Sequence, residues 1–223
     1  MTPRAVREPL SRERVLGAAV AIADAEGLKA LTMRRLAADL DVEAMSLYYH
    51  LPAKEALLDG VVETVLAEVL ATVSTAGDSG HWRERLRGRF LAARQVMLRH
   101  PWAPGLLGTR KSVPAIIYAY YDGIVATMVG AGFSYRLAHR ALHSFGSMTL
   151  GFVQEIFSPA DGFEEDTSED ELAAMAEAVP NLTAMIASEV HAAGDPMLGW
   201  CDSQVEFEFT LDLLLDGLER LRT

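Results

Sequence analysis

The sequence predicts an all-α protein, and three observations support this. Apolar residues recur at spacings of three and four along most of the 223 residues, strand-like alternation is scarce, and Gly or Pro separates the helical segments. The pattern predicts a three-helix N-terminal domain over residues 1–54 and a larger helical domain over 55–223, joined by a long helix over 53–75. Half of the residues are apolar, so the chain can bury a sizeable core.

The first helix is predicted to run from Ser11 to about Glu26. Ser11 can cap it, because a serine oxygen accepts a hydrogen bond from a backbone amide of the first turn. Val15, Ala19 and Ile22 then share one face of the helix. Gly27, which follows, is expected to end it.

Two short helices are predicted next. Thr32 can cap a helix of about two turns over 33–39, a turn follows at 41–42, and a second helix covers 43–49 before Pro52 stops it. Two short helices joined by a tight turn and packed on a longer helix form a helix-turn-helix, whose second helix enters the DNA major groove. We therefore expect the N-terminal domain to bind double-stranded DNA.

Helical segments continue beyond a Gly-rich break at 77–80. They are predicted at about 81–99, 114–129, 134–157 and 203–222, with a loop at 158–171 and a helical stretch broken at Pro180. The last helix carries two adjacent apolar stripes, one through Phe207 and Leu211 and the other through Phe209 and Leu213. Such a helix is either buried centrally in its own domain or covered by a partner subunit.

The net charge of −11 is unevenly distributed. The first 54 residues hold eight Lys and Arg against seven Asp and Glu, a net of +1, whereas the remainder holds 12 against 24, a net of −12. An acidic body can help to orient a neutral or basic end toward DNA. An excess of acid also keeps a surface soluble, and the sequence leaves both interpretations open.

The sequence argues against several other classes of protein. The single Cys201 excludes an internal disulfide and a multi-cysteine zinc site. No uncharged apolar run reaches the roughly 18 residues of a membrane span, and the first residues lack the apolar core of a secretion signal. Nucleophile elbows, Gly-rich nucleotide loops and His-Glu-x-x-His helices are absent. We therefore expect a soluble, cytoplasmic protein with no membrane partner, cofactor, metal or enzymatic activity.

The second short helix and its surroundings supply the candidate DNA contacts. Small side chains at Ala44 and Ser46 permit close approach to base edges, and Arg34 can bind a guanine in bidentate fashion. Tyr49 either packs in the core or reaches a phosphate. The candidate DNA contacts are Thr32, Met33, Arg34, Ala44, Met45, Ser46, Tyr48, Tyr49, His50 and Lys54.

These segments resemble the DNA-binding module of the tetracycline-repressor (TetR) family. The resemblance rests on residues 32–40 (TMRRLAADL) and 46–58 (SLYYHLPAKEALL), in which a Leu-Tyr-aromatic-His segment ends the recognition helix and a Lys follows. It implies that family members touch DNA at the positions of six of the candidates, which are Arg34, Met45, Ser46, Tyr48, His50 and Lys54. It also implies a homodimer, because the family's penultimate long helix and last helix, here about 134–157 and 203–222, form a four-helix bundle with their symmetry mates.

The C-terminal half resembles the ligand domain of tetracycline repressors, notably at 107–110 (LGTR) and 149–153 (TLGFV). In those repressors a histidine before the Leu-Gly-Thr-Arg motif binds the drug's magnesium, and Leu106 stands there in this chain. Glu155 matches the family's acidic residue near the metal, but Val69 and Leu70 replace a pair of histidines. A leucine has no lone pair for a metal, so tetracycline with magnesium is not the expected inducer.

An apolar small-molecule pocket is expected instead. The candidate ligand-binding residues are Trp102, Leu106, Arg110, Ile117, Tyr121, His143, Met148, Phe152 and Glu155, with Phe145 also considered. Each apolar member can equally be plain core. His139 and His143 lie one helical turn apart, but no third ligand is evident, so no metal site is expected.

The combined expectation is a ligand-responsive transcriptional repressor that binds operator DNA as a homodimer. A small, largely apolar inducer would bind within 81–157 and shift the long helix 53–75, which would change the separation of the two recognition helices and release DNA. Two alternatives stay open at this point. One is a helical adaptor that has lost DNA binding, and the other is an enzyme whose catalytic residues form no familiar motif.

Overall fold

The computed structural model describes residues 9–75, 80–111, 114–152, 174, 176–189 and 203–222, and every described element is helical. The predicted all-α fold class is therefore confirmed. The chain divides into two compact units, one of residues 1–153 with 222–223 and one of residues 154–221, and each is treated separately below. None of the described helices is both long enough and apolar enough to cross a membrane.

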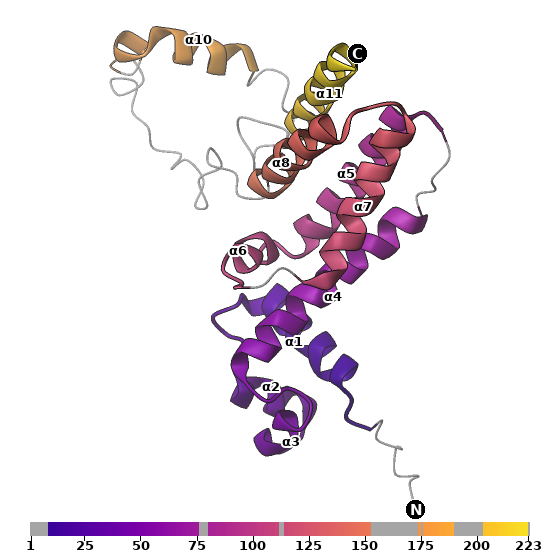
Figure 1. Ribbon diagram of the computed structural model, residues 1–223. Helices are drawn as coiled ribbons and strands as arrows, with labels where there is room; N and C mark the ends of the chain where they lie inside the picture. The colour runs from indigo at the N-terminus through magenta and orange to yellow at the C-terminus, as the bar shows by residue number, and fades with distance from the viewer. Residues whose placement is uncertain are drawn as a thin grey trace, which may run out of the picture. The chain divides into compact units, whose positions relative to one another are not determined.

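The N-terminal end is built from three helices, α1 (Arg12–Glu26), α2 (Met33–Leu40) and α3 (Ala44–Tyr48) (Figure 1). Both predicted caps are present. The Ser11 oxygen accepts a hydrogen bond from the Arg14 amide at 3.2 Å, and the Thr32 oxygen accepts one from the Arg35 amide at 3.1 Å. The expected start of α1 and the expected start of α2 therefore coincide with those in the structure.

The turn between α2 and α3 depends on a left-handed residue. Asp41 closes α2 with φ of 54°, a region that Asp tolerates better than most non-glycine residues. This turn reverses the chain so that Leu47 of α3 is fully buried beside the buried Leu36 of α2. The same turn leaves the opposite edge of α3 exposed.

The long helix α4 (Lys54–Thr75) packs both against the N-terminal core and against helices that follow it in the chain. Its first turns bury Leu57 and Val61 against α1, and its later turns bury Val69 against the next helix, α5 (Trp82–Arg99). Gly60 permits the close approach of α1, because a Cβ there would lie 2.6 Å from a Leu16 methyl. The prediction of a helix over 53–75 is confirmed to within one residue.

Four helices complete the first unit: α5 (Trp82–Arg99), α6 (Ala103–Gly108), α7 (Ala115–Gly130) and α8 (Tyr135–Gly151). Helix α5 packs against α4, α7 and α8. Phe90 of α5 stacks on Phe145 of α8, with ring centroids 4.4 Å apart, so this part of the core is aromatic.

Helix α6 was not predicted from the sequence. It has six residues and includes Pro104 in its first turn, where a missing amide proton removes no helical hydrogen bond. The chain leaves α8 in a turn at Phe152, whereas the sequence predicted a helix to 157. Residues 153–157 and the predicted loop 158–171 lie outside the described residues.

The second unit contains α10 (Pro180–Glu189) and α11 (Ser203–Leu221). Pro180 is the first residue of α10, so the expected break falls at that proline. Along α11, Phe207, Leu211 and Leu215 are fully buried. The neighbouring stripe stays exposed, at 60% for Phe209 and 51% for Leu213.

Candidate DNA-binding surface and ligand pocket

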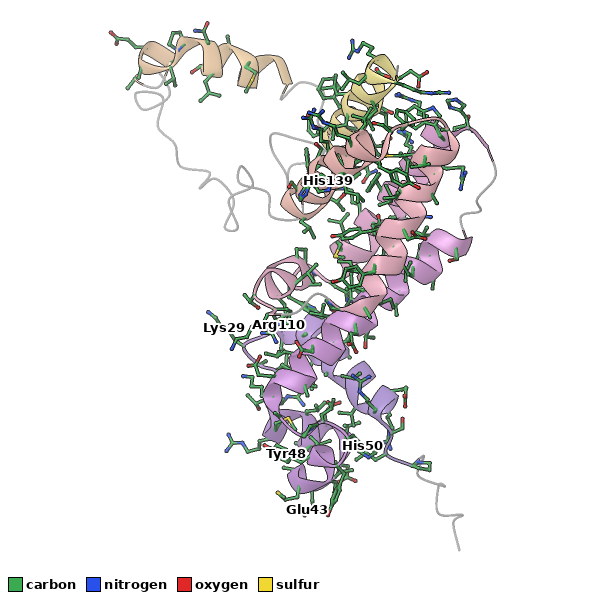
Figure 2. All side chains as sticks on the ribbon, viewed as in Figure 1. Lys29, Glu43, Tyr48, His50, Arg110 and His139 are labelled. Carbon is green, nitrogen blue, oxygen red and sulfur yellow. The ribbon has the colours of Figure 1, made fainter. Side chains whose placement is uncertain are left out.

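Helix α3 presents one exposed edge. Leu47 anchors the helix in the core, while 70% of Met45 and 90% of Tyr49 are exposed. Tyr48 is 40% exposed, and Figure 2 shows it near His50 and Glu43 at the same end of the unit. Of the two interpretations of Tyr49, the core position is therefore wrong.

The remaining candidates lie on α2 or at its N-cap, on α3, in the turn after α3, or at the start of α4. Arg34 on α2 and Lys54 at the start of α4 are exposed, whereas Met33, Ala44, Ser46 and His50 are half-buried. Thr32 is exposed too, although its hydroxyl oxygen is engaged in capping α2. We call this surface, made by the ten candidate DNA contacts, the α3 surface.

Arg34 and Arg35 are neighbours with different surroundings. Arg35 pairs with Glu26 of α1 at 2.7 Å and with Asp39 at 3.2 Å, and the hydrogen bond that its guanidinium donates to Glu26 raises the pKa of Arg35. Among the described residues, no carboxylate forms an ion pair with Arg34. Arg35 therefore ties α1 to α2, while the guanidinium of Arg34 can reach a ligand.

A polar cluster links α1 and α4 to the end of α5. His100, only 6% exposed, places Nδ1 at 2.8 Å from Asp24 Oδ1 of α1 and Nε2 at 3.0 Å from Glu68 Oε2 of α4. Trp102 Nε1 donates to the same Asp24 oxygen at 2.7 Å. Arg99 also bonds to Glu68. We call Asp24, Glu68, Arg99, His100 and Trp102 the polar cluster.

Arg110 forms a second link to the long helix. It follows α6, and its guanidinium donates to Glu55 at 2.9 Å and to Asp59 at 3.2 Å, both on the first turns of α4. Its side chain is only 10% exposed. Arg110 therefore connects the end of α6 to the start of α4.

The first unit contains an apolar cavity between α4, α5, α6, α7 and α8. It encloses about 590 Å³ of space, including its opening to solvent. Its lining residues are Leu66, Val69, Phe90, Ala93, Met97, Leu107, Ile116, Ile117, Tyr120, Tyr121, Leu142, Gly146, Thr149 and Leu150. A mostly apolar cavity with a few polar groups is the usual form of a small-molecule site.

The predicted and observed linings share Ile117 and Tyr121. Trp102 and Arg110 are instead engaged with acidic residues of α1 and α4, and His143 is exposed on α8. The other described candidates, Leu106, Met148 and Phe152, are buried or half-buried but do not line the cavity. Glu155 lies outside the described residues, and ligand contact by any candidate stays a prediction.

Sequence reasoning missed the contribution of α4 to the cavity. Leu66 and Val69 line it because the inner face of α4 continues past the N-terminal core. Val69 had a usable signal, since the resemblance placed it where tetracycline repressors have a metal-site histidine. For Phe90, Met97 and Leu142 periodicity gave no signal, because it does not say which helix faces which.

Two polar features of the cavity bear on its chemistry. Burial raises the pKa of the Tyr120 and Tyr121 phenols, so both stay protonated and neutral near pH 7. The hydroxyl oxygen of Thr149 is buried without a hydrogen-bond partner among the described residues. The described part of the chain also holds no group of three or more His, Cys, Asp or Glu that could bind a metal.

Two regions of the chain match families of known proteins. Residues 15–61 match the family described as "Bacterial regulatory proteins, tetR family", and residues 75–222 match "Tetracyclin repressor-like, C-terminal domain". The class C tetracycline repressor protein of Escherichia coli is 32% identical over 215 residues, which cover 96% of this chain and 92% of that relative.

Solved structures agree with the sequence matches. A possible TetR family transcriptional regulator from Streptomyces coelicolor A3(2) is similar with a TM-score of 0.74 and 31% identity, covering 95% of this chain and all of that one. The S. coelicolor protein ActR, crystallised with actinorhodin, gives a TM-score of 0.69 at 27% identity, covering 94% of this chain and 95% of that one.

Proposed function

Because the chain belongs to the TetR family of bacterial regulatory proteins and has a tetracycline-repressor-like C-terminal domain, we propose that it is a ligand-responsive transcriptional repressor. In this proposal a homodimer binds operator DNA through the α3 surface and releases it when a small, largely apolar inducer occupies the cavity. The exposed edge of α3, held in place by the buried Leu47, is the observation that carries the proposal.

The α3 surface has the groups that reading a major groove requires. The exposed Met45 and the small Ala44 can contact a thymine methyl, and Arg34 can bind guanine through two hydrogen bonds. Tyr48 and Lys54 offer donors to the flanking phosphates, which position a recognition helix without reading sequence.

The way in which a recognition helix contacts base pairs argues for a homodimer. One recognition helix contacts few base pairs, so specificity requires two copies about one DNA turn apart. We propose that residues of about 134–157 and 203–222 form the interface, as the family resemblance implies. The exposed apolar stripe of α11 supports this, because Val205, Phe209 and Leu213 are all more than half exposed in the single chain.

Helix α4 is the proposed route from the cavity to the α3 surface. Leu66 and Val69 line the cavity, while Leu57 and Val61 lie in the N-terminal core one to three turns earlier on the same rigid helix. A ligand that prefers one position of α4 shifts the population toward it, and the two recognition helices then lose the half-site spacing.

The DNA-binding half of the proposal is tested by gel shift with DNA from upstream of the chain's own gene. Arg34→Ala and Tyr48→Ala should each weaken specific binding by about 5- to 150-fold, the loss expected for one base or phosphate contact. Lys111→Ala and Tyr118→Ala are matched controls, because they remove an exposed cation and an exposed tyrosine outside the α3 surface.

Two outcomes would contradict this assignment. Full binding by both α3-surface variants would show that the contacts lie elsewhere. Absence of binding by the wild-type protein to any upstream DNA would favour the helical adaptor. The release step is tested separately, by measuring operator affinity at saturating concentrations of a compound that raises the melting temperature; unchanged affinity would refute it.

A further inference from the structure

The chemistry of the cavity restricts what it can hold. Among the described residues that line it, none is Asp, Glu, Lys, Arg or His. A charged group taken into such a lining would lose its water without gaining a counter-charge, which is strongly unfavourable. A metal-bound ligand would find no carboxylate or imidazole among these described lining residues.

Of the buried side-chain atoms that lack a hydrogen-bond partner among the described residues, one belongs to the cavity lining. Thr149 on α8 is 7% exposed and lines the cavity, and its hydroxyl oxygen has no partner among the described residues. Threonines inside helices often donate to the carbonyl four residues earlier, as Thr64 does to Gly60 at 2.8 Å and Thr127 does to Gly123 at 2.8 Å. Thr149 makes no such bond, so its hydrogen-bonding capacity is available to a ligand.

The lining also favours a flat ligand. Phe90, Tyr120 and Tyr121 contribute aromatic rings, which bind other rings by offset stacking or edge contacts. Gly146, one turn before Thr149 on α8, leaves open space, because a Cβ built on it meets nothing within 4 Å. Among the residues that the structure describes, no side chain therefore fills the space at Gly146, one turn from Thr149.

We propose that this cavity binds an uncharged, metal-free aromatic molecule carrying a hydroxyl or carbonyl group that hydrogen-bonds to the Thr149 hydroxyl. The inference rests on the proposed function, in which binding of a ligand in the cavity releases DNA. It adds the chemical class of that ligand and the residue that selects it. A site that pairs the buried Thr149 hydroxyl with a ligand group discriminates against a ligand lacking that group, because the hydroxyl is then left unpaired.

Three probes of one ring system test the ligand class by calorimetry on the full chain. They are naphthalene, 2-naphthol and 2-naphthoate, which differ in carrying no polar group, a hydroxyl or a negative charge. We expect 2-naphthol to bind up to about tenfold more tightly than naphthalene, which is the range of a single neutral hydrogen bond. We expect 2-naphthoate to bind most weakly.

Thr149→Val tests the selecting residue, because it replaces the hydroxyl by a methyl of similar size. The variant should lose the preference for 2-naphthol over naphthalene while its affinity for naphthalene is unchanged. Its melting temperature should rise, because an unsatisfied buried hydroxyl has been removed. A merely structural Thr149 would alter stability without changing the ratio of the two affinities.

Gly146→Leu tests the location, because its side chain would fill the open space, and Gly130→Leu is the control at an exposed, equally open position. We expect 2-naphthol binding to fall at least tenfold in Gly146→Leu and to stay unchanged in Gly130→Leu. Tightest binding of 2-naphthoate, no binding of any probe, or a naphthol preference that survives in Thr149→Val would overturn the proposal. Operator binding by the ligand-free protein is measured separately, so failure here and failure of the proposed function are distinguishable.

Discussion

His100 Nδ1 lies 2.8 Å from Asp24 Oδ1, and this contact joins the residue after α5 to α1, 76 positions earlier in the chain. The same carboxylate oxygen accepts a hydrogen bond from Trp102. The Asp24 carboxylate of α1 therefore pairs with two ring nitrogens, those of His100 and Trp102, just before α6 begins. The polar cluster is consequently a specific connection between the α3 surface's supporting helix and the helices around the cavity.

We predict that Asp24→Ala destabilises the protein by about 1–3 kcal/mol, because it leaves the ring nitrogens of His100 and Trp102 without their acceptor. Urea unfolding at pH 7 measures the change. Asp122→Ala, at an exposed aspartate of α7, is the control and should change stability by less than about 0.5 kcal/mol. Equal stability of the two variants would contradict a structural role for the cluster.

Glu68 should make stability sensitive to acid. Burial raises the pKa of this carboxyl, but the hydrogen bonds from Arg99 and His100 outweigh that effect, so its pKa lies below the ordinary value of 4.5. A carboxylate with a lowered folded-state pKa stabilises the fold at pH values above 4.5, and that stabilisation is lost as pH falls through the folded pKa.

The expected result is a Glu68→Gln variant that is less stable than wild type at pH 7 and whose difference from wild type shrinks below about pH 4.5. Urea unfolding from pH 7 to pH 3 gives the two profiles. Glu177→Gln, at an exposed glutamate of the second unit, should follow wild type throughout. Parallel profiles for Glu68→Gln and wild type would exclude the linkage.

Local sequence signals predicted most of the fold, because they act over a few residues. The oxygens of Ser11 and Thr32 cap helices where the sequence indicated, and Leu47 is buried as its spacing implied. Helix α6 was missed because six residues containing Pro104 carry no helical period. In the sequence Pro104 predicted a break between helices, whereas in the structure it lies in the first turn of α6.

The site was only partly predictable, because its partners are distant in sequence. Arg110 was expected at the pocket, but it bonds to Glu55 and Asp59, more than 50 positions earlier. No periodicity could show that pairing. The exposure of Arg34, Met45 and Tyr48 was easier to predict, since they lie on two adjacent short helices whose inner faces are marked by the spacing of Leu36 and Leu47.

Two glycines provide a test of the contact between α1 and α4. Gly60→Ala should destabilise by about 1–3 kcal/mol, because its Cβ would overlap a methyl of the buried Leu16. Gly17→Ala is the matched control on α1, where the Cβ meets nothing within 4 Å. It should stabilise by about 0.5–1 kcal/mol through helix propensity. Thermal unfolding compares them, and stabilisation by Gly60→Ala would mean that α1 can move away from α4.

Lys54 should act through phosphate and not through bases. If it neutralises one phosphate in each subunit, Lys54→Ala should weaken operator and random DNA alike, and the slope of log affinity against log salt should become less negative by about 2. Affinities at several salt concentrations measure the slope. Lys111→Ala should leave it unchanged, and an unchanged slope in Lys54→Ala would remove this residue from the α3 surface.

The exposed stripe of α11 gives the prediction for assembly. Phe209→Asp and Leu213→Asp together place two charges where more than half of each apolar side chain faces solvent in the single chain. If a second copy covers these side chains, the charges would be buried unpaired in the dimer, which is strongly unfavourable, while the isolated chain would tolerate them. Sedimentation equilibrium should then give a dimer for wild type and a monomer for the double variant. The variant should also lose specific operator affinity, because one recognition helix reads too few base pairs.

Arg220→Asp, which introduces the same charge at an exposed polar position of α11, should stay dimeric. A double variant that remains dimeric and binds its operator with wild-type affinity would place the interface elsewhere on the chain.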